Sequence, residues 1–239
     1  MTSRSRKDAL RGILHGLGIE VVRYLPRNFL HLRRAELLRS GAISLVLDVG
    51  AGDGSWALQL RRAGFRGRLV SVEPLTESYA QLQARCCADP GWEAFHVALG
   101  DREGTADLYV AGTAQSSSLL PMAARHVEAA PGTAVVGTET VAVTRLDSLG
   151  VVHEHGRTYL KLDVQGAELQ VLHGATSTLR ATEAVEAELS LVELYEGQAL
   201  LPDVVTELAR ANFRFVAMEP SFRDPRTGDL LQVNGLFRP

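Results

Sequence analysis

The sequence predicts an α/β fold in which helices cover both faces of a doubly wound, mostly parallel sheet. First, short apolar runs alternate with amphipathic stretches from residue 44 onward, at the spacing of repeated strand–helix units. Second, a glycine-rich turn at residues 50–54 separates the first apolar run from the first amphipathic stretch. Third, the last two apolar runs are joined by a short turn at residues 224–228 rather than by a helix, so we expect this C-terminal pair to be an antiparallel hairpin.

Each predicted element follows from a local pattern. Short apolar runs bounded by turn-forming residues are typical of buried strands, and amphipathic stretches closed by glycine or proline are typical of helices. The stretch 111–138 is rich in small and polar residues, so we expect a long loop with a short helix there. The expected strands lie at 44–49, 68–72, 94–99, 106–110, 140–145, 159–163, 185–194, 213–218 and 230–237, and the expected helices at 55–63, 77–88, 168–179 and 202–211.

Residues 8–40 predict helices ahead of the sheet. Leu10, Ile13, Leu14 and Leu17 recur at helical spacing, and Pro26 precedes a second helix at residues 29–38. We therefore divide the chain into a helical, basic accessory segment at 1–40 and a main domain at 41–239. Deleting the accessory segment is expected to spare cofactor binding by the main domain while weakening turnover of its substrate.

Length and composition narrow the class of protein. A chain of 239 residues suits one domain with a short appendage. No run of 18 apolar residues is present, and the N-terminus lacks the pattern of a secretory signal. The two cysteines, Cys86 and Cys87, are adjacent, which favours free thiols and a reducing compartment. We therefore expect a cytoplasmic protein.

The charge is distributed unevenly along the chain. Residues 1–40 hold nine Lys or Arg and three Asp or Glu, a net charge of +6, whereas the remainder carries −9. A basic segment of this kind could contact nucleic acid, an anionic membrane surface or an acidic substrate, and a solvated helical face is the simpler interpretation.

The turn at residues 47–54 is the most informative segment. Its glycines at positions 50, 52 and 54 permit positive φ and close approach of a ligand, and the helix that follows offers free N–H groups. A dinucleotide motif would need glycine where Ser55 stands. Asp48 and Asp53 add acid that disfavours a pyrophosphate and suits a ligand carrying an ammonium and a sulfonium. A purely structural turn is the alternative.

The second predicted strand ends in Glu73 and Pro74. Glu73 lies 19 residues after Gly54, where an acidic residue of a nucleotide-binding sheet can bind both ribose hydroxyls. A solvent-exposed glutamate is the alternative. Together, the turn and this acid predict a nucleoside ligand.

From about residue 45 to residue 237 the chain resembles the FkbM family of O-methyltransferases, which are class I S-adenosylmethionine-dependent enzymes. Three blocks carry the resemblance, at residues 47–54, 97–104 and 159–168. Two positions depart from the family pattern: Asp53 stands where Asn is frequent, and Gln165 replaces the common Glu, which removes an acidic group near the site. The resemblance implies a Rossmann-like sheet with S-adenosylmethionine at its glycine turn.

The resemblance also implies roles for individual residues. The glycines would contact the amino-acid part of the cofactor, Glu73 would hold the ribose, and residues 98–99 would flank the adenine. The expected cofactor-binding residues are Asp48, Gly50, Ala51, Gly52, Asp53, Gly54, Glu73, Pro74, Ala98 and Leu99, and the expected acceptor-binding residues are Ser116, Ser117 and Ser118.

A hydroxyl acceptor must lose its proton, which calls for a general base or a metal ion. Asp163 is the first candidate base because it ends an apolar strand, where open α/β sheets bind ligands. Binding only the cofactor ammonium, or capping the following loop, is the alternative role. His126 is the one histidine placed where an acceptor would enter, and an exposed loop histidine is the simpler interpretation.

Acidic residues within a buried strand are unexpected unless they are paired. Glu188, or its neighbour Glu186, is therefore expected to form an ion pair with Lys161, which shares a strand face with Asp163. The alternative is that Asp163 and Glu188 share a divalent ion such as Mg²⁺.

These patterns favour methyl transfer to a hydroxyl of a small molecule, such as a saccharide, a glycolipid sugar or a secondary metabolite. The alternatives are a nicotinamide-dependent oxidoreductase, an RNA methyltransferase recruited by the basic segment, and a non-catalytic binding module. We expect no nucleic-acid partner, because the acidic main domain repels phosphate. Peripheral membrane contact through residues 1–40 and either a monomer or a homodimer remain open.

Overall fold

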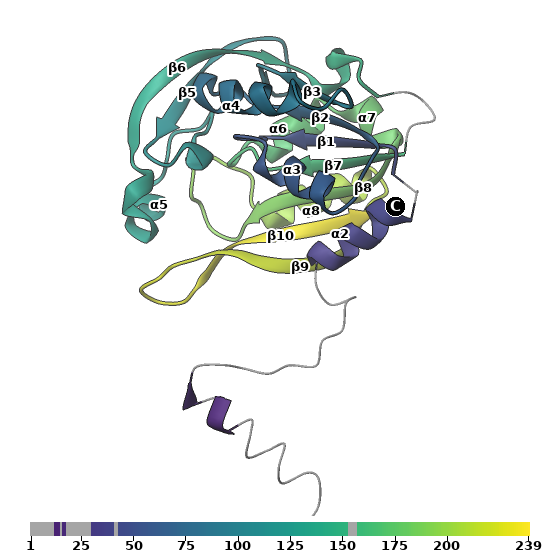
Figure 1. The fold of residues 1–239 in the computed structure, drawn as a ribbon. Coiled ribbons are helices and arrows are strands. Elements are labelled where there is room, and N and C mark those ends of the chain that lie inside the picture. The colour runs from purple at the N-terminus through teal and green to yellow at the C-terminus, as the bar shows by residue number, and fades with distance from the viewer. Residues whose placement is uncertain (1–11, 15, 18–29, 41–42, 153–156) are drawn as a thin grey trace, which may run out of the picture.

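The computed structural model describes residues 12–14, 16–17, 30–40, 43–152 and 157–239. Its main feature is a seven-stranded sheet in which four neighbouring pairs are parallel and the two pairs made by β10 are antiparallel (Figure 1). In order across the sheet the strands are β3 (Trp92–Phe95), β2 (Arg68–Val72), β1 (Leu45–Val49), β7 (Thr158–Leu162), β8 (Thr182–Ser190), β10 (Leu230–Arg238) and β9 (Arg214–Arg223). The predicted fold class and the C-terminal antiparallel hairpin are confirmed.

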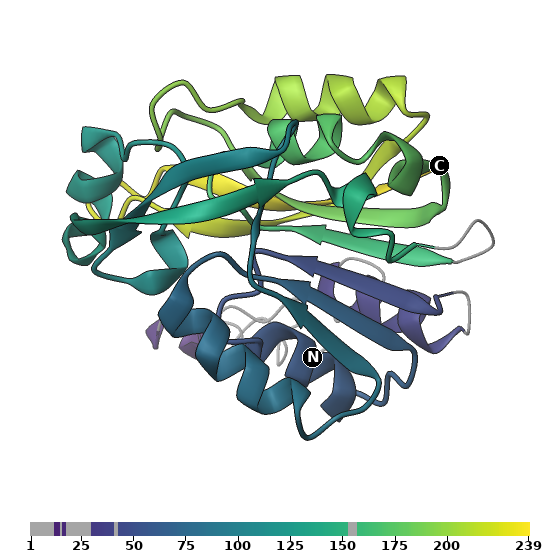
Figure 2. The same ribbon diagram turned by 90° about the horizontal axis from the view of Figure 1, so that it is seen from above.

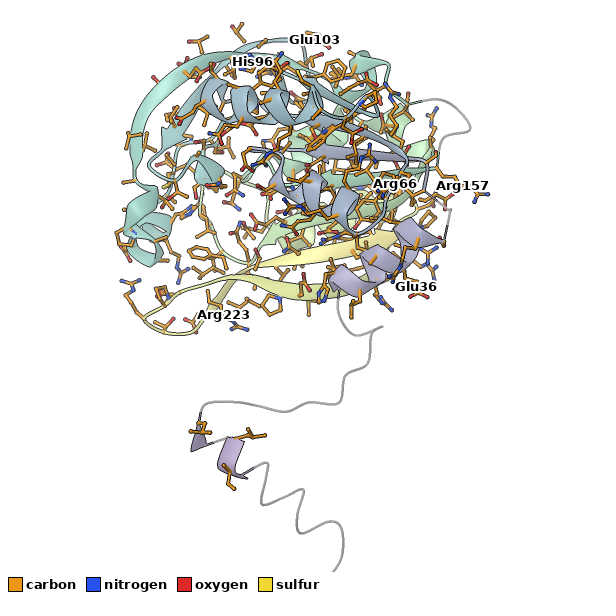
Figure 3. All side chains as sticks on the ribbon, in the orientation of Figure 1. Glu36, Arg66, His96, Glu103, Arg157 and Arg223 are labelled. Atoms are coloured by element: carbon orange, nitrogen blue, oxygen red, sulfur yellow. The ribbon has the colours of Figure 1, made fainter. Side chains whose placement is uncertain are left out.

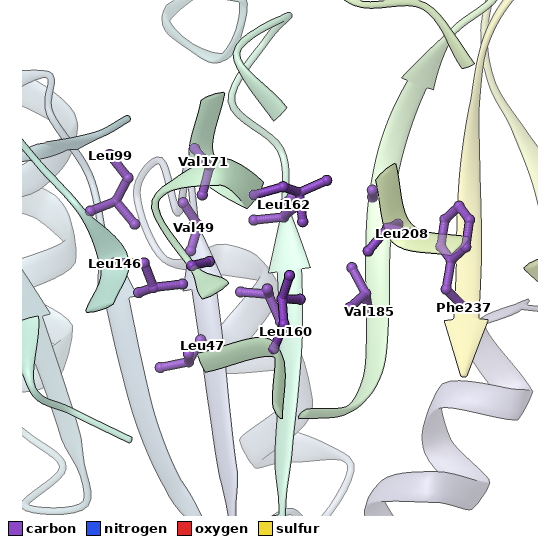
Figure 4. Packing of buried hydrophobic residues seen from close by; sticks show 14 of the residues in the cluster. Leu47, Val49, Leu99, Leu146, Leu160, Leu162, Val171, Val185, Leu208 and Phe237 are labelled. Atoms are coloured by element: carbon purple, nitrogen blue, oxygen red, sulfur yellow. The ribbon is translucent and has the colours of Figure 1, made fainter. Parts of the chain in front are cut away.

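Helices cover both faces of this sheet (Figure 2). Alternate strand residues point to opposite faces; Val46 packs in one apolar cluster and Leu47 in the other. The face of Val46 is covered by α2 (Leu30–Arg39), α3 (Ser55–Arg62) and α4 (Thr76–Cys86), and the face of Leu47 by α6 (Glu168–His173), α7 (Thr176–Arg180) and α8 (Leu201–Arg210). Figure 4 shows the second cluster, to which β7 contributes Leu160 and Leu162 and α8 contributes Leu208.

A second, three-stranded sheet replaces part of the predicted loop. Its strands are β4 (Ala98–Leu99), β6 (Val135–Thr144) and β5 (Gly104–Ala111), with β6 in the middle. The strand predicted at 94–99 is therefore wrong as one element, because the chain leaves the main sheet after Phe95 and joins β6 at Ala98. The stretch 111–138 contains the helix α5 (Ala124–Ala129), 3₁₀ turns at Ala114–Ser116 and Pro131–Thr133, and the start of β6.

Two other predicted elements are shorter than expected. The helix predicted at 168–179 is interrupted at Gly174, where a Cβ atom would lie 2.1 Å from the carbonyl oxygen of Gly100. Because the two backbones approach so closely, only glycine fits there, and the chain restarts as α7. The strand predicted at 185–194 ends at Ser190. Residues 191–195 instead run toward the segment before α5, where Tyr195 forms an isolated β-bridge with Met122.

Helix α2 belongs to the core of the main sheet. Leu30 is fully buried in the same cluster as Val46 and Leu236. The Arg34 guanidinium donates to both carboxylate oxygens of Glu186 at 2.7 and 2.5 Å, and Glu186 also accepts from the Tyr159 hydroxyl. These contacts pack α2, which the predicted division assigns to the accessory segment, against the main sheet.

The first helix predicted within residues 8–40, which carries Leu10 to Leu17, lies largely outside the described residues, although Ile13 and Leu17, which are described, are exposed. The six side chains labelled in Figure 3, Glu36, Arg66, His96, Glu103, Arg157 and Arg223, are all exposed. In the part of the chain that the structure describes, no helix is long and apolar enough to cross a membrane. Cys86 and Cys87 are both free thiols, as predicted.

Candidate active site

A cavity of about 370 Å³ lies at the carboxyl ends of β1, β2 and β7. This is the position at which open α/β sheets bind ligands. Its wall is made by the glycine turn, the end of β2, the β3–β4 connection, a segment before α5 and the end of β7. The wall includes residues of the segments 50–53, 73–74, 97–99, 114–119 and 163–165.

The glycines of the turn have different tasks. Gly50 has a φ of +74°, and a Cβ atom there would lie 1.8 Å from the carbonyl oxygen of Asp163, so only glycine lets β1 and β7 end this close together. Gly52 lines the cavity, and a Cβ atom there would meet nothing within 4 Å. Gly54, predicted to bind the cofactor, is instead turned to the core, where a Cβ atom would lie 2.7 Å from Leu82.

Glu73 connects the glycine turn to the end of β2. One carboxylate oxygen accepts from the Gly52 N–H at 2.8 Å and the other from the Leu75 N–H at 2.9 Å. Burial raises the pKa of this carboxyl above its ordinary value. A carboxylate offers about four acceptor sites, so Glu73 retains acceptor capacity on the cavity side. That capacity fits a pair of vicinal hydroxyls, the expected ribose contact.

The register of the central strands explains the charges beneath the cavity. Asp48 of β1, Lys161 of β7 and Glu186 of β8 are neighbours in register and therefore share one face of the sheet. The Lys161 ammonium lies 3.1 Å from Asp48 and 3.3 Å from Asp163. The predicted pair of Lys161 with Glu186 or Glu188 is wrong, because Arg34 binds Glu186.

Asp48 itself was expected to bind the cofactor, but it lies behind the turn, fully buried, and does not line the cavity. Lys161 does line it, and its ammonium lies 5.2 Å from the ring centroid of Trp56, another wall residue. The charged residues of the wall are Asp53, Glu73, Asp163 and Lys161. Asp48 neutralises the positive charge of Lys161 from behind the wall. The net charge of the cavity wall is therefore negative, which suits a cationic ligand.

Asp163 is joined to Glu188 through the side chain of Gln165. The Gln165 amide nitrogen donates to Asp163 at 2.7 Å and to Glu188 at 2.8 Å, while its oxygen accepts from the Tyr195 hydroxyl at 2.8 Å. Asp163 lines the cavity with its side chain 36% exposed, and Glu188 lies behind it. Ser221 and Gln232 also donate to Glu188. Burial, followed by repulsion from Asp163, raises the pKa of Glu188 to about 7.

The expected acceptor-binding serines hold the wall segment in place. Ser117 and Ser118 line the cavity, whereas Ser116 does not. The Ser118 hydroxyl donates to the backbone oxygen of Gln165 at 2.6 Å, and the Ser117 hydroxyl accepts from the Ala111 N–H at 3.1 Å. The Ser118 hydroxyl thus ties the segment 114–119 to the loop after β7, and the Ser117 hydroxyl ties it to the end of β5.

His126 lies away from the cavity wall. It belongs to α5 and is buried, with its ring centroid 5.1 Å from that of Tyr195 and 5.6 Å from that of Phe222. Burial lowers the pKa of its imidazole. The expectation of a loop histidine at the acceptor entrance is corrected, because a helix and aromatic packing place His126 in a satellite core.

Sequence reasoning missed the functional contacts of Gln165, Tyr195 and Trp56. The only signal for Gln165 was its departure from the family pattern, and the other two carried none. No group of three or more His, Cys, Asp or Glu side chains within the described residues is arranged to hold a metal ion. The shared divalent ion between Asp163 and Glu188 therefore gains no support from the side chains around them.

Glu168 gives a testable pH dependence of stability. It is buried and accepts from the Val164 and Gly166 N–H groups at 3.1 Å each, and burial raises its pKa to about 8. Since the folded pKa exceeds the unfolded one, the unfolded chain ionises first, and stability falls as pH rises from about 4.5 to 8. Each pKa unit corresponds to about 1.4 kcal/mol.

We expect Glu168→Gln to flatten this decline, measured as the slope of the melting temperature between pH 5.5 and 8.5. Glu188 contributes in the same direction, so a smaller slope should remain. Glu77→Gln, an exposed position on α4, is the control and should leave the slope of the parent protein unchanged. An equal slope in Glu168→Gln would contradict the assignment.

Comparisons with known proteins agree with this geometry. The family model described as "Methyltransferase FkbM domain" matches residues 48–215. The 2-O-methyltransferase NoeI of Sinorhizobium fredii (strain NBRC 101917 / NGR234) is 30% identical over 185 residues, which cover 74% of this chain and 74% of that protein.

A solved structure agrees in fold. Methyltransferase FkbM from Methylobacillus flagellatus KT has a TM-score of 0.52 at 15% identity and covers 85% of this chain. This chain spans about half, 47%, of that structure. With the glycine turn, Glu73 and Asp163 assembled around one acidic cavity, the chain belongs to the FkbM family and is an S-adenosylmethionine-dependent methyltransferase.

Proposed function

We propose that this protein transfers a methyl group from S-adenosylmethionine to a hydroxyl oxygen of a saccharide or a similar polyhydroxylated small molecule. The observation that carries the proposal is Asp163, a partly exposed carboxylate at the end of β7 inside the cavity. A carboxylate in this position can accept the proton that a hydroxyl loses when its oxygen gains a methyl group. The 2-O-methyltransferase NoeI supports a hydroxyl acceptor.

The residues of the wall fit the cosubstrate. Glu73 has acceptor capacity for the ribose hydroxyls, Gly52 leaves open space beside it, and Ala98 and Leu99 supply an apolar wall for a base. The acidic wall suits the positive sulfonium. When bound, S-adenosylmethionine supplies a methyl group that is already activated for in-line transfer to an oxygen.

The chain's own residues contribute orientation and a proton acceptor. Lys161 lies against one Asp163 oxygen and Gln165 against the other, so the Asp163 carboxylate is fixed in the wall. Fixed positioning of this kind can supply roughly 7–11 kcal/mol toward a reaction between two bound groups. Asp163 then receives the hydroxyl proton.

Calorimetric titration with S-adenosylhomocysteine tests the cosubstrate site. We expect binding by the parent protein and a loss of roughly 10–100-fold for Glu73→Ala, because hydrogen bonds to a charged group contribute about 1.5–3 kcal/mol. Glu77→Ala, an exposed glutamate on α4, is the matched control and should bind as the parent does. Absence of binding by the folded parent protein would overturn the proposal.

The acceptor can be identified by incubating the protein with isotope-labelled S-adenosylmethionine and fractionated saccharides. Mass spectrometry of the labelled product would give the acceptor and the methylated oxygen. Label in an amine or a carbon atom, with none on oxygen, would contradict O-methylation.

A further inference from the structure

The orientation of the Gln165 amide is determined by its three partners. The NH₂ group donates to Asp163 and to Glu188, because carboxylate oxygens accept hydrogen bonds, and both of its hydrogens are used there. The amide oxygen then faces the Tyr195 hydroxyl. Hence a neutral group with two partial positive hydrogens lies between two carboxylates.

The backbone of Gln165 shows how tightly this arrangement is held. Its φ of +53° is in the left-handed region, which is strained for a residue other than glycine. The backbone oxygen accepts from Ser118, so main chain and side chain are anchored to three different segments. The strained conformation is what directs the amide between the two acids.

A cation that bridged Asp163 and Glu188 would occupy the position of the Gln165 amide nitrogen. A calcium ion lies about 2.3–2.6 Å from carboxylate oxygens, and the Gln165 nitrogen lies 2.7 and 2.8 Å from the same two groups. We propose that Gln165 is a positioning residue whose amide replaces a bridging cation, so that Asp163 and Glu188 are held as a pair without a divalent ion. The catalytic meaning of the pair rests on the proposed function, whereas the exclusion of a cation from this place does not.

The proposal predicts that one substitution converts the place into a cation site. Gln165→Glu brings a third carboxylate to Asp163 and Glu188, which suits a hard, oxygen-liganded ion. Tb³⁺ is the probe, because Tyr195 next to the site can sensitise its luminescence. We expect Gln165→Glu to bind Tb³⁺ roughly 10–100-fold more tightly than the parent protein, the usual range for altered metal ligation, with displacement by Ca²⁺.

Gln232→Glu is the matched control. Gln232 also donates to Glu188, at 3.0 Å, but its partners are Glu188 and Ser190 and not Asp163. It should therefore gain little Tb³⁺ affinity. Equal affinities of the parent and a folded Gln165→Glu variant, or of Gln165→Glu and Gln232→Glu, would overturn the proposal.

Gln165→Gly keeps the test decisive if the glutamate variant fails to fold. Glycine suits the left-handed backbone and empties the space between Asp163 and Glu188. We expect it to bind Tb³⁺ more tightly than the parent, and unchanged affinity would count against the proposal. These readouts need neither cosubstrate nor acceptor. Failure of S-adenosylhomocysteine to bind would therefore remove the proposed function and leave the cation result standing.

Discussion

Replacing Arg34 by methionine is expected to lower the free energy of unfolding by about 3–5 kcal/mol, the usual cost of breaking a buried ion pair. The Arg34 side chain is 14% exposed and that of Glu186 is 5% exposed, so the carboxylate left behind cannot be solvated. Tyr159 can donate only one hydrogen bond to it. Urea denaturation of Arg34→Met and the parent protein measures the difference directly.

Two variants test this interpretation. The double variant Arg34→Met with Glu186→Gln removes both charges and should recover most of the loss, because the penalty comes from the unpaired carboxylate. Arg39→Met, an exposed position on the same helix, should change stability by less than about 0.5 kcal/mol. A similarly small effect of Arg34→Met would refute a stabilising role for the pair.

The same contacts reverse an expectation about the N-terminal segment. The sequence predicts that deleting residues 1–40 spares cofactor binding and weakens only acceptor turnover, but this deletion removes Arg34 and the buried Leu30. We now expect a chain that starts at residue 41 to be severely destabilised. A chain that retains α2 in full keeps both contacts.

Asp163→Asn is expected to reduce kcat by about 100–10,000-fold, the contribution typical of a general base. The substitution preserves size while removing the proton acceptor. Affinity for S-adenosylhomocysteine should change only a few-fold, because Glu73 and the glycine turn remain intact. Initial rates with the acceptor identified by labelling, together with calorimetry, separate the two effects.

Asp101→Asn supplies the control, since Asp101 is exposed and does not belong to the main cavity wall. Its kcat should equal that of the parent. If Asp163→Asn keeps full kcat, or loses activity only in proportion to cosubstrate affinity, then Asp163 binds the cosubstrate rather than accepting the proton.

Local sequence patterns were sufficient to predict the site residues that directly follow a buried strand. Gly50, Glu73 and Asp163 all follow buried strands, and the carboxyl ends of neighbouring parallel strands meet at one edge of the sheet. Their convergence therefore follows once the strands are recognised. The direction that each glycine faces does not follow from the strands. The sequence therefore predicts a ligand contact for Gly54, whereas the structure packs it against Leu82.

Contacts between distant segments could not be predicted. Arg34 and Glu186 are 152 positions apart, and nothing local distinguishes Arg34 from its neighbour Arg33. Lys161 pairs with Asp48 and Asp163, and Glu186 is bound instead by Arg34 of helix α2, which the sequence could not indicate. His126 is buried only because the segment after β8 and the β9–β10 hairpin bring Tyr195 and Phe222 against it.

The placement of Trp56 has a practical consequence. The chain contains two tryptophans. The ring of Trp92 is buried with its N–H on Ser71, whereas that of Trp56 forms part of the cavity wall, with the cationic groups of Lys161 and Arg34 each 5.2 Å from its centroid. One indole therefore reports on the occupied cavity and the other on the folded core. The protein thus carries an intrinsic optical probe of binding together with its internal reference, and needs no attached dye.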